Sequence, residues 1–175
     1  MTTDLRYPIG KFAPPASSTP DDRRGRIEEI AELPAALRAA VDGLSAAQLD
    51  TPYRPGGWTV RQVAHHVPDS HINAYVRFRL ALTEQEPTIR PYEEKAWAEL
   101  ADARTLPPDV SLALLDALHD RWTTLLRALP DAAWGRRLHH PESGVHTLDW
   151  MLALYAWHGR HHVAHVTSLR ERMGW

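Results

Sequence analysis

The stretch that decides the fold is TVRQVAHHVPDSHINAYVRFRLALT, residues 59–83. Its first residues have the spacing of a capping box, in which Thr59 and Gln62 satisfy free backbone N–H groups where a helix starts. Apolar side chains then recur every three or four positions and form one stripe, made of Val60, Val63, Val67, Ala74, Phe78 and Leu82. This period predicts a long helix with one face in a core. Pro68 should free one backbone carbonyl inside that helix and bend it.

Three other segments have a helical period. The first begins near Asp22 and contains Pro34, which we expect to kink or restart the helix. The second runs from about 111 to 129, with a stripe of Leu112, Leu115, His119, Trp122, Leu126 and Leu129. The third runs from about 147 to 172. Residues 45–48 predict a short capped turn and residues 93–100 a short helix, whereas no strand is expected. These parts predict an all-α four-helix bundle with long connections and short extra helices.

The composition of this 175-residue chain fits one folded domain. Prolines concentrated near the start predict an extended arm over residues 1–20, which leaves residues 21–175 as a single bundle domain. With a formal charge of −2 and no long apolar run, we expect neither nucleic-acid nor membrane binding. The N-terminus lacks the pattern of a signal peptide, which favours a cytoplasmic protein. Because the chain has no cysteine, a transition-metal site must use histidine and carboxylate.

The segment WHGRHHVAH, residues 157–165, holds four of the eleven histidines. Residues four apart lie on the same face of a helix, so two pairs compete to share a metal ion: His158 with His162, and His161 with His165. The apolar stripe of this helix passes through His158 and His162, which we therefore expect to point inward. His165 lies about 60° from that stripe and can still line a pocket. From spacing alone, a hydrogen-bonded core role is an equal alternative for the inward pair.

A third ligand is available on the helix of residues 59–83. His66 lies on a face that borders its apolar stripe, so it can meet the inward pair if the two helices are neighbours. Three imidazoles suit zinc, nickel, copper or iron and leave an open position, as catalytic sites do. Asp69, one turn after His66, is a candidate partner of a ligand or a general base. The remaining histidines are interpreted as exposed or loop residues: His119, His139, His140 and His146.

Several segments together resemble the YfiT group of the DinB-like superfamily, described as metal-dependent hydrolases. They include residues 7–10, 50–54, 56–63, 90–92 and 172–175, together with His65-His66 and Asp69-Ser70-His71. The resemblance covers essentially the whole chain. It implies a four-helix bundle, a homodimer and one divalent ion, zinc or nickel, held by His66, His158 and His162. Broader relatives have Arg-Gly-Gln after the last ligand, where this chain has Val-Ala-His, so His165 takes the glutamine position and its role stays open.

Three functions remain to be separated. The resemblance implies hydrolysis of a small molecule by water activated at the metal. Other members of the superfamily are similar to thiol S-transferases that use bacillithiol or a related thiol, for which Arg54, Arg61 and Arg160 are candidate contacts at the pocket mouth. The third alternative is a non-catalytic bundle stapled by its metal. Structural zinc normally has four protein ligands, which argues against this last function.

Overall fold

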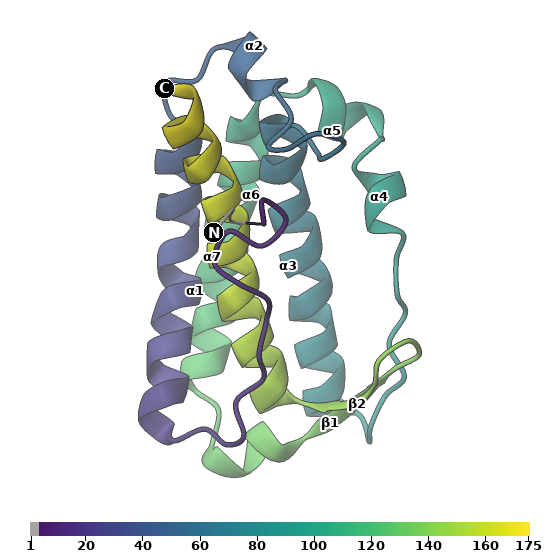
Figure 1. Cartoon of the computed structure of the whole chain (residues 1–175). Coiled ribbons are helices and arrows are strands. Elements are labelled where there is room, and N and C mark those ends of the chain that lie inside the picture. Colours follow the sequence, from purple (N-terminus) through teal and green to yellow (C-terminus); the bar gives the residue numbers. More distant parts are fainter. Residues whose placement is uncertain (1–3) are drawn as a thin grey trace.

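The computed structural model describes residues 4–175, so Met1, Thr2 and Thr3 of the expected arm lie outside the described residues. Four long helices lie side by side as a bundle: α1 (Pro20–Val41), α3 (Val60–Thr83), α6 (Pro108–Arg127) and α7 (Leu148–Met173) (Figure 1). α3 packs against both α6 and α7, and α1 packs against the same two helices. The predicted all-α bundle is therefore confirmed, and the helices that carry the candidate ligands are neighbours.

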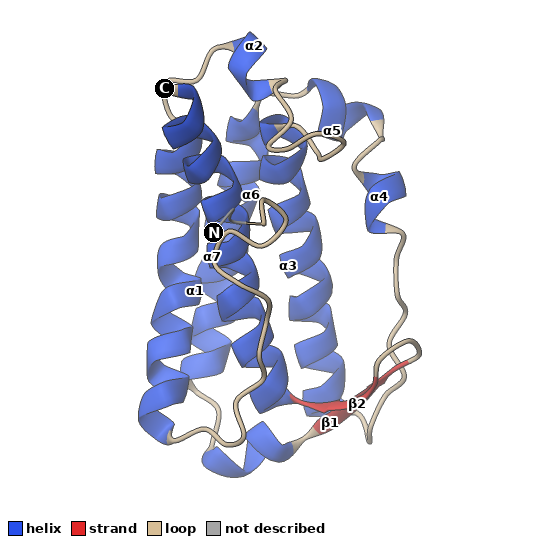
Figure 2. Cartoon of the chain, viewed as in Figure 1, coloured by secondary structure: helices blue, strands red, loops and turns tan. Residues whose placement is uncertain are grey.

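The connections contain short elements (Figure 2). They are α2 (Ala46–Leu49), α4 (Glu94–Trp97), α5 (Ala101–Thr105), the 3-10 helix η1 (Asp131–Gly135), β1 (Arg137–His140) and β2 (Gly144–Thr147). The short helix expected around residues 93–100 is confirmed as α4, although it ends earlier, at Trp97, and a further helix, α5, begins at Ala101. No helix within residues 4–175 is long and apolar enough to cross a membrane.

Capping boxes start the helices where the sequence indicates them. The Gln62 backbone N–H donates to Thr59 Oγ1 at 3.1 Å, and the Thr59 N–H donates to Gln62 Oε1 at 3.0 Å. Ser45 caps α2 in the same way. A third box, which combines Thr19 with Asp22, starts α1 at Pro20, slightly earlier than expected. Proline suits this first helical position because its missing N–H is not needed there.

The two prolines inside long helices do not end them. α1 continues past Pro34 to Val41, so the expected restart is wrong, and α3 continues past Pro68 to Thr83. A proline lacks the N–H that would bond the carbonyl four residues earlier. Pro34 therefore leaves the Ile30 carbonyl without its helical partner, in the interior of the bundle.

The absence of strands was a wrong expectation, because residues 137–147 form a β-hairpin. β1 and β2 pair antiparallel from Arg137 opposite Thr147 to His140 opposite Gly144. Strands of four residues are too short for a clear alternating pattern. Tertiary bonds also hold β1: the His139 N–H donates to the Pro87 carbonyl at 2.9 Å, and the Ile89 N–H donates to the His139 carbonyl at 3.0 Å.

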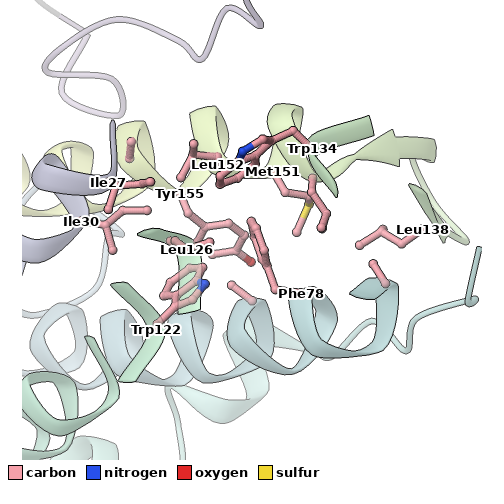
Figure 3. Close-up of a cluster of buried hydrophobic side chains, with 14 of the residues drawn as sticks. Ile27, Ile30, Phe78, Trp122, Leu126, Trp134, Leu138, Met151, Leu152 and Tyr155 are labelled. Atoms are coloured by element: carbon pink, nitrogen blue, oxygen red, sulfur yellow. The ribbon is translucent and has the colours of Figure 1, made fainter. Parts of the chain in front are cut away.

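The buried apolar residues form two clusters at different heights in the bundle. Figure 3 shows the first, in which Phe78, Trp122 and Tyr155 meet between the helices. The second lies nearer the start of α3 and the end of α7, and includes Leu37, Val63 and Val166. Between these clusters, α3, α6 and α7 present buried histidines instead of apolar residues. The bundle thus has a polar middle layer.

The cap of α3 gives a stability prediction. Replacing Thr59 by alanine removes the Oγ1 that accepts the Gln62 N–H and leaves the backbone N–H of residue 59 in place, so the free energy of unfolding should fall by about 1 kcal/mol. Urea unfolding followed by circular dichroism measures this loss. Thr124→Ala is the control, since Thr124 is exposed within α6 and its hydroxyl bonds only the Asp120 carbonyl. Equal effects of the two substitutions would contradict the capping role.

Candidate metal centre

The structure brings together His66 from α3 with His158 and His162 from α7. One nitrogen of each ring lies within 4.8 Å of a nitrogen of each of the others. Within the cluster, His158 Nε2 and His162 Nε2 are 3.1 Å apart. The four-residue spacing places these two rings one above the other on α7. Three imidazoles from two packed helices thus face one point in the middle layer.

The donor set fits a divalent transition metal. Zinc binds histidine nitrogen at about 2.0–2.1 Å with tetrahedral angles, which separates two such nitrogens by roughly 3.3 Å. The 3.1 Å between the two Nε2 atoms of α7 is close to this value. A metal also requires neutral imidazole. Burial lowers the pKa of His66 to about 4 and lowers the pKa values of His158 and His162 well below the usual range.

The side chain of Trp58 covers two of the three rings. Its ring centroid lies 4.6 Å from that of His66 and 6.5 Å from that of His162. Trp58 directly precedes the capping residue of α3, and its carbonyl accepts a hydrogen bond from the Tyr53 N–H at 3.0 Å. The breaker-rich loop before α3 therefore fixes an apolar wall against the candidate ligands.

His65, the neighbour of His66 in sequence, is directed elsewhere. Its Nδ1 is 2.7 Å from Ser111 Oγ, and its Nε2 donates to the Leu106 carbonyl at 3.0 Å. Adjacent residues point to different sides of a helix, so only one member of this pair can reach α7. That member is His66, the residue expected from the sequence.

His161 and His165 stay outside the three-histidine cluster but are buried by another segment. The chain before α1 runs along α7 (Figure 1). The Tyr7 ring lies 6.0 Å from His161, and His165 Nε2 donates to the Arg6 carbonyl at 3.2 Å. The His165 ring also stacks on Tyr53 at 4.0 Å. A helical stripe cannot reveal this cover, because it comes from residues far away in the sequence.

Among the histidines interpreted as exposed or loop residues, His119 is a clear error. It is only 2% exposed and lies in the middle layer, on the apolar face of α6. Its position in the stripe between Leu115 and Trp122 was the signal that could have identified it. His139, His140 and His146 are partly exposed as expected, although they lie on the hairpin strands and not in a loop.

Two histidines that the sequence did not single out for the site connect it to α1. His71 is fully buried, with Nε2 3.2 Å from His158 Nδ1 and Nδ1 3.0 Å from His119 Nε2. His119 Nδ1 in turn lies 2.5 Å from the Ile30 carbonyl, the group that Pro34 leaves free. A candidate ligand is therefore joined to the backbone of α1 through two further imidazoles.

Asp69 lies three residues after His66 on α3 and is half-buried. Residues three apart are neighbours on a helix surface, which keeps Asp69 on the same side of α3 as His66, and its charge interactions are with Asp102 and Tyr92. Burial, together with the negative charge of Asp102, raises the pKa of Asp69 to about 6. A carboxyl that titrates near neutral pH suits a general base.

Comparison with known proteins places the chain in a family. The model of the DinB superfamily matches residues 29–166. A Bacillus mycoides protein, provisionally named a metal-dependent hydrolase, is 56% identical over 98% of this chain and 99% of its own length. YfiT of Bacillus subtilis, provisionally named in the same way, is 52% identical over 99% of this chain and 98% of its own length.

Solved structures agree with this result. The structure of Bacillus subtilis YfiT, described as a four-helix bundle of unusual topology, matches with a TM-score of 0.96 at 53% identity, over 98% of both chains. A second four-helix-bundle protein matches with a TM-score of 0.57 at 21% identity, over 83% of this chain and 98% of its own. The second match bears on the fold alone.

The raised pKa of Asp69 predicts a pH-dependent cost to stability. Below its usual pKa of 3.8 the carboxyl is protonated whether folded or unfolded, whereas above about 6 the folded protein must bury a charge. In metal-free protein, Asp69→Asn should therefore stabilise increasingly as pH rises from 4 to 7. After allowance for partial exposure, we expect about 1–2 kcal/mol at pH 7.

Urea unfolding at four pH values measures this gain. Asp120→Asn, at an exposed position of α6, controls for the general loss of a negative charge. A gain for Asp69→Asn that does not change with pH would contradict the burial of this carboxyl.

Proposed function

This chain belongs to the DinB superfamily, and we propose that it is a metal-dependent hydrolase whose divalent ion is held by His66, His158 and His162. The observation that carries the proposal is the convergence of three imidazoles, two buried and that of His158 half-buried, each with a nitrogen within 4.8 Å of the others. The names of its relatives support the same class of enzyme. Zinc and nickel are the proposed ions, because both accept several imidazole ligands.

An open position favours catalysis over a structural role. Structural zinc sites are closed by four protein ligands, whereas catalytic sites use three and leave room for water or substrate. Among residues 4–175, the cluster has three members. When bound, a divalent ion lowers the pKa of a coordinated water to about 7 and so supplies a nucleophile at neutral pH.

The residues around the ligands have separate tasks in this proposal. Asp69 is the proposed general base, because its raised pKa would let its carboxylate take up a proton near neutral pH. Trp58 excludes bulk water from one side of His66 and His162, which strengthens electrostatic interactions within the site. A small-molecule substrate and a homodimer, both carried over from the resemblance to the YfiT group, complete the proposal.

Thiol transfer is the alternative that the arginines were expected to support. Arg61 is buried, with Nε bonded to Asp50 at 2.7 Å, and Arg160 pairs with Glu29 of α1 at 3.2 Å. Arg54 donates to its neighbours Tyr53 and Pro55. Each of the three arginines is therefore already bonded to other protein groups, and the three do not share a common partner. This favours hydrolysis over a reaction in which these arginines bind an anionic thiol.

The ligand assignment predicts the metal content of variants. His66→Ala, His158→Ala and His162→Ala should each reduce bound zinc at least tenfold after dialysis, because a two-histidine site holds the ion weakly. Elemental analysis of the purified proteins measures this. His161→Ala is the matched control and should keep about one ion per chain, since His161 neighbours a ligand in sequence but lies outside the cluster. Nearly stoichiometric zinc in all three ligand variants would refute the assignment.

The reaction class predicts how turnover responds to an added thiol. Hydrolysis of a p-nitrophenyl ester reporter should require zinc and should not change when a low-molecular-weight thiol is added. Asp69→Asn should reduce this rate about 10²-fold or more if the carboxyl is the base. Release of nitrophenol together with mass spectrometry of the products measures both effects. A zinc-dependent thiol conjugate in place of the hydrolysed acid would support transfer instead.

A further inference from the structure

We infer that His71 and His119 are positioning residues that fix the tautomer of His158 and thereby hold its Nε2 lone pair toward the metal position. Neither residue belongs to the three-histidine cluster, and together they join it to the backbone of α1. The inference rests on the proposed function and adds to it a reason why one ligand is ready to bind before the ion arrives.

The chain of hydrogen bonds begins at a group whose role is unambiguous. The Ile30 carbonyl can only accept, and Pro34 leaves it without the N–H that would bond it inside α1. His119 Nδ1 lies 2.5 Å from this oxygen, so the proton of His119 is on Nδ1. A neutral imidazole has one proton, which makes His119 Nε2 an acceptor.

The same rule fixes the next two rings in turn. His119 Nε2 lies 3.0 Å from His71 Nδ1, so His71 must donate from Nδ1 and accept at Nε2. His71 Nε2 lies 3.2 Å from His158 Nδ1, which must then be the protonated nitrogen of His158. The only nitrogen of His158 that keeps a free lone pair is Nε2, the atom that faces His162 Nε2 at 3.1 Å.

Burial prevents water from replacing a member of the chain. His71 is 0% exposed and His119 is 2% exposed. The rings of Trp122 and Tyr155 lie edge-on to His71, with centroids 5.6 and 5.2 Å away. A buried imidazole that loses its partner cannot find another. The Ile30 carbonyl, which can only accept, therefore determines which nitrogen is protonated in each ring as far as His158.

His162 shows what a ligand without such a chain looks like. Its Nδ1 is buried and has no hydrogen-bond partner among the described residues. Histidines that bind metals usually donate from the second nitrogen to an acceptor, which sets the tautomer and raises the basicity of the ligating nitrogen. In this centre, that support reaches His158 through His71 and His119.

The first part of the test reads the tautomers directly. Long-range ¹H–¹⁵N spectra of the full-length, metal-free protein at pH 7 distinguish Nδ1–H from Nε2–H rings. We expect His71, His119 and His158 all to carry the proton on Nδ1. A proton on Nε2 of His71 or His119 would overturn the inference, and this measurement needs no substitution that could impair folding.

The second part measures zinc affinity by competition with a chelator. His119→Phe keeps a ring of similar size but removes the donor and acceptor, and should weaken zinc binding about tenfold or more. His119→Gln keeps both functions in one amide and should restore the affinity to within about threefold of wild type. Leu126→Ala, a core truncation on the same helix, controls for destabilisation and should leave the affinity within about threefold.

The outcomes separate the two proposals. Zinc binding by His119→Phe as tight as wild type would overturn the positioning role and leave the proposed function intact. An equal loss of affinity in His119→Phe, His119→Gln and Leu126→Ala would also overturn it, because the loss would then follow stability. A wild-type protein that binds no zinc would refute the proposed function, and the positioning role with it.

Discussion

The rest of the structure depends on the burial of uncharged imidazoles halfway along the bundle. Helical bundles normally fill this layer with apolar side chains, because an unpaired polar group in the interior destabilises the fold. Here apolar clusters lie on both sides of the layer, and histidines occupy the space between them. Burial keeps these rings neutral, and neutral rings are the form that binds metals. The burial of neutral imidazoles therefore lowers the stability of this layer and also makes the layer suitable for binding a metal.

The buried histidines of this layer differ in whether both of their ring nitrogens have hydrogen-bond partners. On one side, His119 and His71 use the carbonyl released by Pro34 to complete a line of hydrogen bonds. On the other, the Nδ1 atom of His162 has no hydrogen-bond partner among the described residues. Unsatisfied groups of this kind gather at functional sites, where a bound ion or a substrate supplies the missing interaction.

Local rules predicted much of this arrangement. The capping box at Thr59 and the stripe of α3 were readable because both depend on residues close in sequence. The stripe of α7 also separated His158 and His162 from His161. What could not be predicted arises from tertiary contacts: the arm that covers His165, the pairing of β1 with residues 87–89, and the depth of His119. The burial of His119 could nevertheless have been predicted, since this residue lies in the apolar stripe of α6. Its partner, the Ile30 carbonyl, could also have been predicted to be free, because Pro34 follows it by four residues.

The measurement that tests this account most directly is the anomalous scattering of zinc in crystals of the full-length protein. The account predicts one strong peak per chain, about 2.0–2.2 Å from a ring nitrogen of each of His66, His158 and His162. For His158, the nitrogen nearest the peak should be Nε2, with Nδ1 still directed at His71. A principal peak at His161 and His165, or no peak within the bundle, would contradict it.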